Sequence, residues 1–181
     1  MAQAVPMVLE ATEAPLQGTA AAFGDLVRSH QAMVFSIALR TLGDRGLAED
    51  VAQEVFFRLS GRLASIESPE HLVRWLCKVT SRLCIDELRR RPPTAAVCLD
   101  DLAGPGADPG DPLASQHLRR LVASLPGSAR LAIVLRYQEG LEPAEIARVL
   151  SEPVNTIKSR LQRALASLRE GFDRLTEGRR P

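Results

Sequence analysis

The sequence predicts an all-α protein made of two small helical domains joined by a flexible linker, the C-terminal one a helix-turn-helix. Hydrophobic residues make up 45% of the 181 positions and aromatic residues only 4%, and the apolar residues are mainly Leu, Ala and Val. Because few stretches combine β-branched residues with strict alternation, the sequence gives little support for β-strands. Apolar positions recur at helical spacing on both sides of residues 92–112. That stretch is rich in proline and glycine, which neither continue a helix nor build a core.

Composition sets the domain boundaries. Residues 1–18 are small, mixed and interrupted by proline, so we expect a disordered tail before a first domain at 19–91. The linker covers 92–112, the second domain 113–175, and a short tail 176–181. The N-terminus lacks the basic start of a signal peptide, and no apolar run approaches the roughly 18 to 20 residues needed to cross a bilayer. We therefore expect a cytoplasmic protein.

The first domain opens with a long amphipathic helix. Phe23, Leu26 and Ile37 fall on one apolar face of it. The segment TLGDRG then breaks the pattern, because its glycines favour a turn. Asp44 in that turn can cap the helix that follows.

The second helix, predicted at 48–59, separates apolar from acidic positions. Its apolar face carries Val51, Val55, Phe56 and Leu59. Its exposed side carries acidic and amide side chains, at Glu49, Asp50, Gln53 and Glu54.

The third helix, predicted at about 70–90, carries a basic stripe that the net charge of +1 conceals. The stripe contains Arg74, Lys78, Arg82 and Arg89, and Arg90 follows it. Like charges four residues apart repel, so such a stripe favours an anionic partner, and nucleic acid phosphates are the natural one. Trp75, near its edge, fits either the core or a stacking platform for unpaired bases.

Four helical pieces are predicted in the second domain, at 113–124, 128–138, 143–150 and 154–172. A three-residue turn, 151–153, separates the last two, which is the helix-turn-helix pattern. The motif predicts that the last helix enters the major groove of DNA.

The last helix has an apolar stripe and a polar face. The stripe contains Val154, Ile157, Leu161, Leu165, Leu168 and Phe172. The candidate DNA-binding residues are Asn155, Thr156, Lys158, Ser159, Arg160 and Arg163. Arg can bond guanine through two hydrogen bonds, and Ser and Thr can reach bases or phosphates. The alternative is a solvated basic face on a structural hairpin.

Three sequence blocks occur in order along the chain: AEDVAQEVFFRL, WLCKVTSRLCIDELRR, and the segment from LPGSARL to RALASLR. Together they resemble the sigma-70 family of RNA polymerase sigma factors, of the extracytoplasmic-function (ECF) type. The resemblance covers about 23–172. Arg82 stands where the family usually has Asn, and Ser151 and Asn155 replace glycines of the family's recognition turn.

The resemblance implies a protein that is not an enzyme and that directs core RNA polymerase to promoters. It implies that Glu49, Asp50, Gln53 and Glu54 dock on the clamp helices of the largest polymerase subunit. It implies minus-ten contacts for Arg74, Trp75, Lys78, Arg82, Arg89 and Arg90. It implies minus-thirty-five contacts for Asn155, Thr156, Lys158, Ser159, Arg160 and Arg163.

The resemblance also implies the partners. These are core RNA polymerase, promoter DNA and an anti-sigma protein, often tethered at the membrane, with the chain a monomer when bound to polymerase. No small-molecule substrate is expected. The resemblance also implies that the linker threads toward the active-site and RNA-exit path of the polymerase, whose walls are basic. The acidic residues of the linker fit such a path: Asp100, Asp101, Asp108 and Asp111.

Other classes of protein have less support. The three histidines, His30, His71 and His117, are scattered, and no HExxH, GxSxG or P-loop motif occurs, so no catalytic residue, metal or cofactor is expected. A sigma mimic that only sequesters an anti-sigma protein could dispense with the basic face of the last helix. A lone helix-turn-helix repressor leaves the first domain unexplained.

The cysteines point to a reducing compartment. Cys77, Cys84 and Cys98 are odd in number and lack CxxC spacing, which argues against a disulfide framework and a zinc ribbon. Cys77 and Cys84 are seven residues apart on one helix face, where buried small hydrophobes are expected, and a metal or redox sensor is the alternative.

Overall fold

The computed structural model describes residues 20–90 and 112–177. Within these ranges the regular structure is entirely helical, as the sequence predicts. The predicted N-terminal tail at 1–18, the acidic residues of the predicted linker and Cys98 lie outside the described residues.

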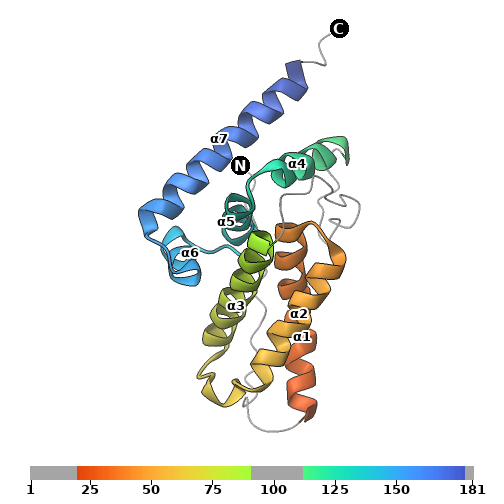
Figure 1. Ribbon diagram of the computed structural model, residues 1–181, viewed down its shortest axis with the longest axis vertical. Helices are drawn as coiled ribbons and strands as arrows, with labels where there is room; N and C mark the ends of the chain where they lie inside the picture. The colour runs from red at the N-terminus through yellow and green to blue at the C-terminus, as the bar shows by residue number, and fades with distance from the viewer. Residues whose placement is uncertain (1–19, 91–111, 178–181) are drawn as a thin grey trace.

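The first three helices lie side by side in one bundle (Figure 1). They are α1 (Ala20–Leu42), α2 (Arg45–Ser60) and α3 (Pro69–Arg90), with a short 3₁₀ turn at Leu63–Ser65 before α3. Gly43, whose φ is 71°, ends α1 in the left-handed region. The side chain of Asp44 accepts a hydrogen bond from the backbone N–H of Leu47 at 2.9 Å, which confirms the predicted cap of α2.

One core holds this bundle together. Val34, Val55, Leu59 and Leu76 are completely buried in it, and they come from all three helices. Phe56 and Trp75 are half-buried and pack against the same core. The predicted apolar faces of the first two helices are therefore confirmed.

The second unit contains α4 (Pro112–Ser124), α5 (Gly127–Tyr137), α6 (Pro143–Leu150) and α7 (Val154–Glu177). The bounds of α6 match the prediction. Helix α7 runs past its predicted end at 172, because no helix-breaking residue follows until Gly178. In Figure 1 its C-terminal part rises away from the other helices.

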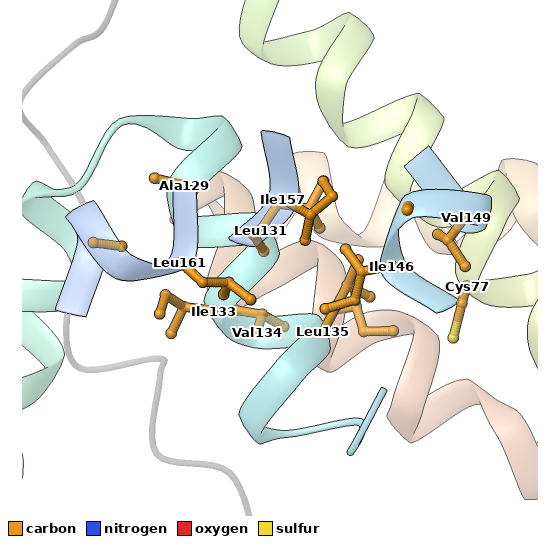
Figure 2. Packing of buried hydrophobic residues seen from close by; sticks show 14 of the residues in the cluster. Cys77, Ala129, Leu131, Ile133, Val134, Leu135, Ile146, Val149, Ile157 and Leu161 are labelled. Carbon is orange, nitrogen blue, oxygen red and sulfur yellow. The ribbon is translucent and has the colours of Figure 1, made fainter. Parts of the chain in front are cut away.

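The two units are packed against each other, which the sequence did not predict. The core of the second unit includes Ile37 of α1 and Cys77 of α3, both completely buried. Figure 2 shows Cys77 beside Val149 of α6. Met33 of α1 packs against both cores. The apolar surface of the second unit is therefore completed by residues of the first.

Polar contacts fix this packing. The buried guanidinium of Arg130 in α5 donates to the backbone carbonyl of Thr41 at 3.0 Å and to that of Leu125 at 3.2 Å. It also donates to the carbonyl of Ala123. These acceptors lie at or just beyond the C-terminal ends of α1 and α4, where carbonyls lack partners within the helix and the helix dipole favours a cation. One side chain therefore caps helices of both units.

A second polar side chain, at the C-terminal end of α5, also joins the units. The side-chain amide of Gln138 donates to the hydroxyl of Ser36 at 3.0 Å and to the carboxylate of Glu139 at 2.6 Å. Burial raises the pKa of Glu139, and the nearby Arg40 of α1 partly offsets that rise.

The two described cysteines are buried in different cores. Cys77 belongs to the core of the second unit and Cys84 to that of the first, although both lie on α3. Burial raises the pKa of each thiol to about 12, so neither is a reactive thiolate near neutral pH. The expected role as small hydrophobes fits this burial. In 20–90 and 112–177 no group of three or more His, Cys, Asp or Glu could hold a metal ion.

Candidate nucleic-acid and polymerase interfaces

Helix α6 begins the helix-turn-helix with a reciprocal cap. Its N-cap is Glu142, whose backbone N–H donates to the carboxylate of Glu145 at 2.9 Å, and the Glu142 side chain accepts from the backbone in return. Pro143 occupies the first turn, where its missing N–H costs nothing. Ile146 and Val149 are buried, so the helix is seated against the core by its apolar side.

The turn after α6 is made by a serine in an unfavourable backbone conformation. Ser151 has φ 56° and ψ 43°, and it is the single residue other than glycine with a positive φ among those described. A side chain in this left-handed region costs on the order of 1 kcal/mol relative to glycine. The N–H of Glu152 closes the turn on the carbonyl of Ala147 at 3.0 Å. The turn thus needs the geometry that glycine supplies most easily.

Helix α7 presents a polar face to solvent. Ile157, Leu161 and Ala164 are buried, which fixes the rotation of the helix. Five of the six predicted DNA-binding side chains are exposed on the other side: Asn155, Thr156, Lys158, Ser159 and Arg163. The ends of the predicted apolar stripe are more open than its middle, with Val154 36% and Phe172 41% exposed.

Arg160 is placed differently from the other five. Its guanidinium makes two hydrogen bonds to the carboxylate of Glu152, at 3.1 and 2.6 Å, and its side chain is only 17% exposed. This pair ties the body of α7 to the turn that precedes it. Phosphate or guanine would have to displace a carboxylate to reach Arg160.

The basic stripe of α3 is mostly exposed. Arg74, Arg82, Arg89 and Arg90 are exposed, and Lys78 is half-buried. Arg89 lies 3.7 Å from Asp86 and Arg90 2.7 Å from Glu87, in exposed pairs that contribute little to stability. Trp75 packs against the first core, so its ring is partly covered.

Arg82 reaches from this stripe to the helix-turn-helix. One guanidinium nitrogen lies 3.4 Å from the hydroxyl of Ser151. A groove of about 460 Å³ lies beside this contact, between α3 and the turn that leads to α7. Ile85, Leu88, Arg89, Ser128, Leu150, Ser151, Glu152 and Arg160 line it.

The acidic side of α2 forms a third exposed surface. Glu49 pairs with Arg45 at 2.9 Å and Glu54 with Arg58 at 2.7 Å, along the same helix. Asp50, Gln53, Glu54 and Phe57 line a shallow hollow of about 450 Å³.

Phe57 in this hollow was missed by the sequence reasoning. Its ring is 76% exposed, the largest value among the exposed large hydrophobics of the described residues. Phe57 follows Asp50 by seven residues and Gln53 by four, so the three share one face of the helix. This spacing is the feature of the sequence from which the position of Phe57 on the acidic face could have been predicted.

The described residues form two helical units, and the second ends in a helix-turn-helix. With the basic faces on α3 and α7, this arrangement defines a DNA-binding protein of transcription. Comparison with known families specifies it further. Residues 26–92 match the model of sigma-70 region 2, and residues 115–168 match that of sigma-70 region 4.

Curated relatives agree. The chain is 32% identical over 172 residues to the ECF RNA polymerase sigma-E factor of Escherichia coli, covering 87% of each protein. It is 28% identical to the ECF sigma factor SigW of Bacillus subtilis, covering 85% of this chain and 90% of SigW. It is 32% identical to the probable sigma factor RfaY of Xanthomonas campestris, over 91% of this chain but 44% of RfaY.

Solved structures share the fold. The sigma factor RpoE in complex with the anti-sigma factor NepR, from Bartonella quintana, has a TM-score of 0.65 at 20% identity, over 83% of this chain and 96% of that one. CnrH in complex with the cytosolic domain of CnrY has a TM-score of 0.61 at 25% identity, over 87% and 92%.

The chain therefore belongs to the sigma-70 family, as a sigma factor of the extracytoplasmic-function type. Its function is promoter-directed initiation of transcription. No helix within 20–90 or 112–177 has the length and apolarity to span a membrane.

Proposed function

We propose that the exposed face of α7 reads the minus-thirty-five element. The observation that carries this assignment is that α7 buries Ile157, Leu161 and Ala164 while holding a polar and basic face to solvent. Thr156 is a short donor suited to base edges or phosphates, and Arg163 can bond guanine through two hydrogen bonds. The Ser159 hydroxyl donates to the backbone carbonyl of Asn155 at 2.9 Å and would exchange that bond for one to DNA. Arg160 acts as a brace between α7 and Glu152, because two of its five N–H donors bond to that carboxylate.

The basic stripe of α3 contacts the minus-ten element. Arg74 and Arg82 supply exposed positive charge for phosphates of the opening duplex. Trp75 is half-buried, so part of this residue remains accessible to an unpaired base. Lys78 lies between these two arginines along α3, and Arg89 and Arg90 extend the basic surface toward the C-terminal end of the helix.

The acidic side of α2 docks on core RNA polymerase, at the clamp helices of the largest subunit. The side chains of Asp50 and Gln53 are exposed and line the hollow on α2, so their polar groups are accessible to a basic partner. Glu49 and Glu54 would exchange pairs with arginines of their own helix for pairs with the polymerase. Phe57, which lines the same hollow, adds an exposed apolar anchor to this surface.

These surfaces act by binding alone, without catalysis or a small-molecule substrate. The chain works in the cytoplasm, where polymerase and DNA are, and an anti-sigma protein restrains it there or at the inner face of the membrane. Among solved structures that share its fold, RpoE is in complex with the anti-sigma factor NepR and CnrH is in complex with the cytosolic domain of CnrY, and the first of these supports such a partner.

Replacing Arg163 with Ala tests the assignment of α7. Loss of one base contact weakens recognition by about 1–3 kcal/mol, so run-off transcription at limiting protein should fall roughly 5- to 150-fold on a promoter with the matching element. The matched control is Arg169→Ala, which removes an exposed arginine from the same helix beyond the proposed contact face.

The two variants separate readout from charge. If Arg163→Ala and Arg169→Ala reduce transcription equally, the effect is electrostatic and the residue assignment is wrong. If Arg163→Ala leaves transcription unchanged, α7 does not read the element through this residue. If the wild-type protein binds an anti-sigma protein but initiates at no promoter, the chain is a sequestering mimic.

A further inference from the structure

Glu152 is bonded to both helices of the helix-turn-helix. Its backbone N–H donates to the carbonyl of Ala147 in α6 at 3.0 Å. Its carboxylate accepts two hydrogen bonds from the guanidinium of Arg160, in the second turn of α7, at 3.1 and 2.6 Å. One residue of the turn therefore connects the helix before it with the helix after it.

The backbone on either side of Glu152 has little freedom. Ser151 precedes it in the left-handed region, with φ 56°. Pro153 follows it, and a proline fixes its own φ and keeps the residue before it out of the helical conformation. The carbonyl of Pro153 accepts from the N–H groups of Thr156 and Ile157, at 3.0 and 3.2 Å, where α7 begins. The backbone thus aims the Glu152 carboxylate at α7.

The pair of Glu152 with Arg160 is partly shielded from water. The Glu152 side chain is 28% exposed and that of Arg160 less, whereas the pair of Arg45 with Glu49 on α2 lies open to solvent. Exposed pairs contribute little, but an arginine that bonds a carboxylate through two nitrogens is held in a defined orientation. This contact can therefore set the position of α7 on the turn.

Arg160 lies between two side chains that are proposed to read the minus-thirty-five element. It follows Thr156 by four residues and precedes Arg163 by three, about one helical turn from each. A tilt of α7 about the turn would move both side chains relative to the bases. Because binding groups must be held within about 0.5 Å of their productive positions, a small tilt is enough to weaken base contacts.

We propose that Glu152 is a positioning residue for promoter reading. Through Arg160 it holds α7 at the angle at which Thr156 and Arg163 reach the bases, without itself touching DNA. This inference rests on the proposed function of α7. Discrimination between minus-thirty-five sequences then depends on a carboxylate in the turn.

Promoter competition with the holoenzyme tests this inference. Two templates compete in one tube for limiting holoenzyme, and they differ only in a minus-thirty-five base pair whose change weakens transcription by the wild-type protein. The ratio of the two run-off transcripts measures discrimination. The ratio does not depend on the amount of folded protein, so a loss of stability alone leaves it unchanged.

Three variants and one control are compared. Glu152→Gln keeps the size of the side chain and removes its charge, and Arg160→Gln removes the other partner. The third variant combines both changes. Glu170→Gln makes the same change of charge at an exposed position on α7 beyond the proposed contact face.

Glu152→Gln should lower the discrimination ratio about three- to tenfold, the size of effect expected for residues coupled in one ion pair. Arg160→Gln should lower it by a similar factor. The double variant should be no worse than Arg160→Gln alone, since Glu152 acts through Arg160. Glu170→Gln should match the wild-type protein.

An undiminished ratio for Glu152→Gln would overturn the inference, and so would losses that multiply in the double variant, because Glu152 would then act independently of Arg160. More transcription from both templates by Glu152→Gln would also overturn it, since the carboxylate would then compete with DNA for Arg160. If no base change in the element alters transcription by the wild-type protein, the proposed function of α7 fails instead.

Discussion

Ser151 occupies a position where the backbone favours glycine. Its φ of 56° closes the turn between α6 and α7, and its hydroxyl is the group that Arg82 approaches. The contact with Arg82 is long and exposed, so it does not offset the backbone cost. The turn is therefore maintained by the packing of α6 and α7 on either side of it.

Replacing Ser151 with Gly should stabilise the protein. Relief of the left-handed conformation is worth about 1 kcal/mol, and for a chain of this size the melting temperature should rise roughly 2–4 °C. Thermal unfolding measures this. Ser167→Gly is the matched control, because it places glycine within α7 and should lower stability by about 0.5–1 kcal/mol. Equal destabilisation by both changes would mean that Ser151 is not strained.

The sequence predicts the orientation of some side chains but not the contacts of others. Periodicity predicts that Thr156 and Arg163 face away from Ile157, and in the structure they do. Periodicity does not predict that Arg160 bonds to Glu152, because that pair depends on the path of the turn. Phe57 was not predicted, because charge patterning does not mark an aromatic side chain, although its spacing from Gln53 puts both on one face of the helix.

Helix α2 combines charge with an exposed aromatic ring. Its two glutamates at the docking surface are engaged with arginines of the same helix, in exposed pairs that salt screens. The charges on α2 therefore contribute more to the orientation of the bound protein than to its affinity for core polymerase. An apolar group such as Phe57 supplies the area that becomes buried on binding.

Phe57→Ala should weaken binding to core polymerase without destabilising the fold. An aromatic anchor at the centre of an interface is typically worth about 2 kcal/mol, so the dissociation constant should rise on the order of 30-fold. Competition binding against a labelled sigma factor measures it. Tyr137→Ala removes a ring that is 62% exposed on α5 and should leave the affinity unchanged. An unchanged affinity for Phe57→Ala would place the docking surface elsewhere.

Helices were predictable where their start and stop signals are local. Asp44 caps α2, and the pairing of Glu142 with Glu145 starts α6, so both starts can be read from neighbouring residues. The packing of α5 against α1 has no such signal. It joins Arg130 to Thr41, which are far apart in the chain, and a proline-rich segment between two helical domains gives no indication of their contact.

At the scale of the whole molecule, Arg130 links the two units. Burial lowers the pKa of its guanidinium, yet a guanidinium remains charged at any pH at which proteins fold. Its positive charge is matched by backbone carbonyls, including that of Thr41 at the end of α1. Removing the side chain leaves those carbonyls buried without a donor.

Arg130→Met should therefore lower the free energy of unfolding by about 2–4 kcal/mol, since Met keeps the packing volume but donates no hydrogen bond. Urea denaturation followed by circular dichroism measures the loss. Arg148→Met, at an exposed position on α6, should change stability by less than about 0.5 kcal/mol. A loss for Arg130→Met no larger than that of the control would contradict its role as a cap for both units.

The most direct measurement adds the purified chain to sigma-free core polymerase on a genomic promoter library and sequences the transcripts. Start sites should appear that core polymerase alone does not use, and they should share two upstream sequence elements at a nearly fixed spacing. Transcripts no different from those of core polymerase alone, in the presence of folded protein, would contradict the account of three cooperating surfaces on one chain.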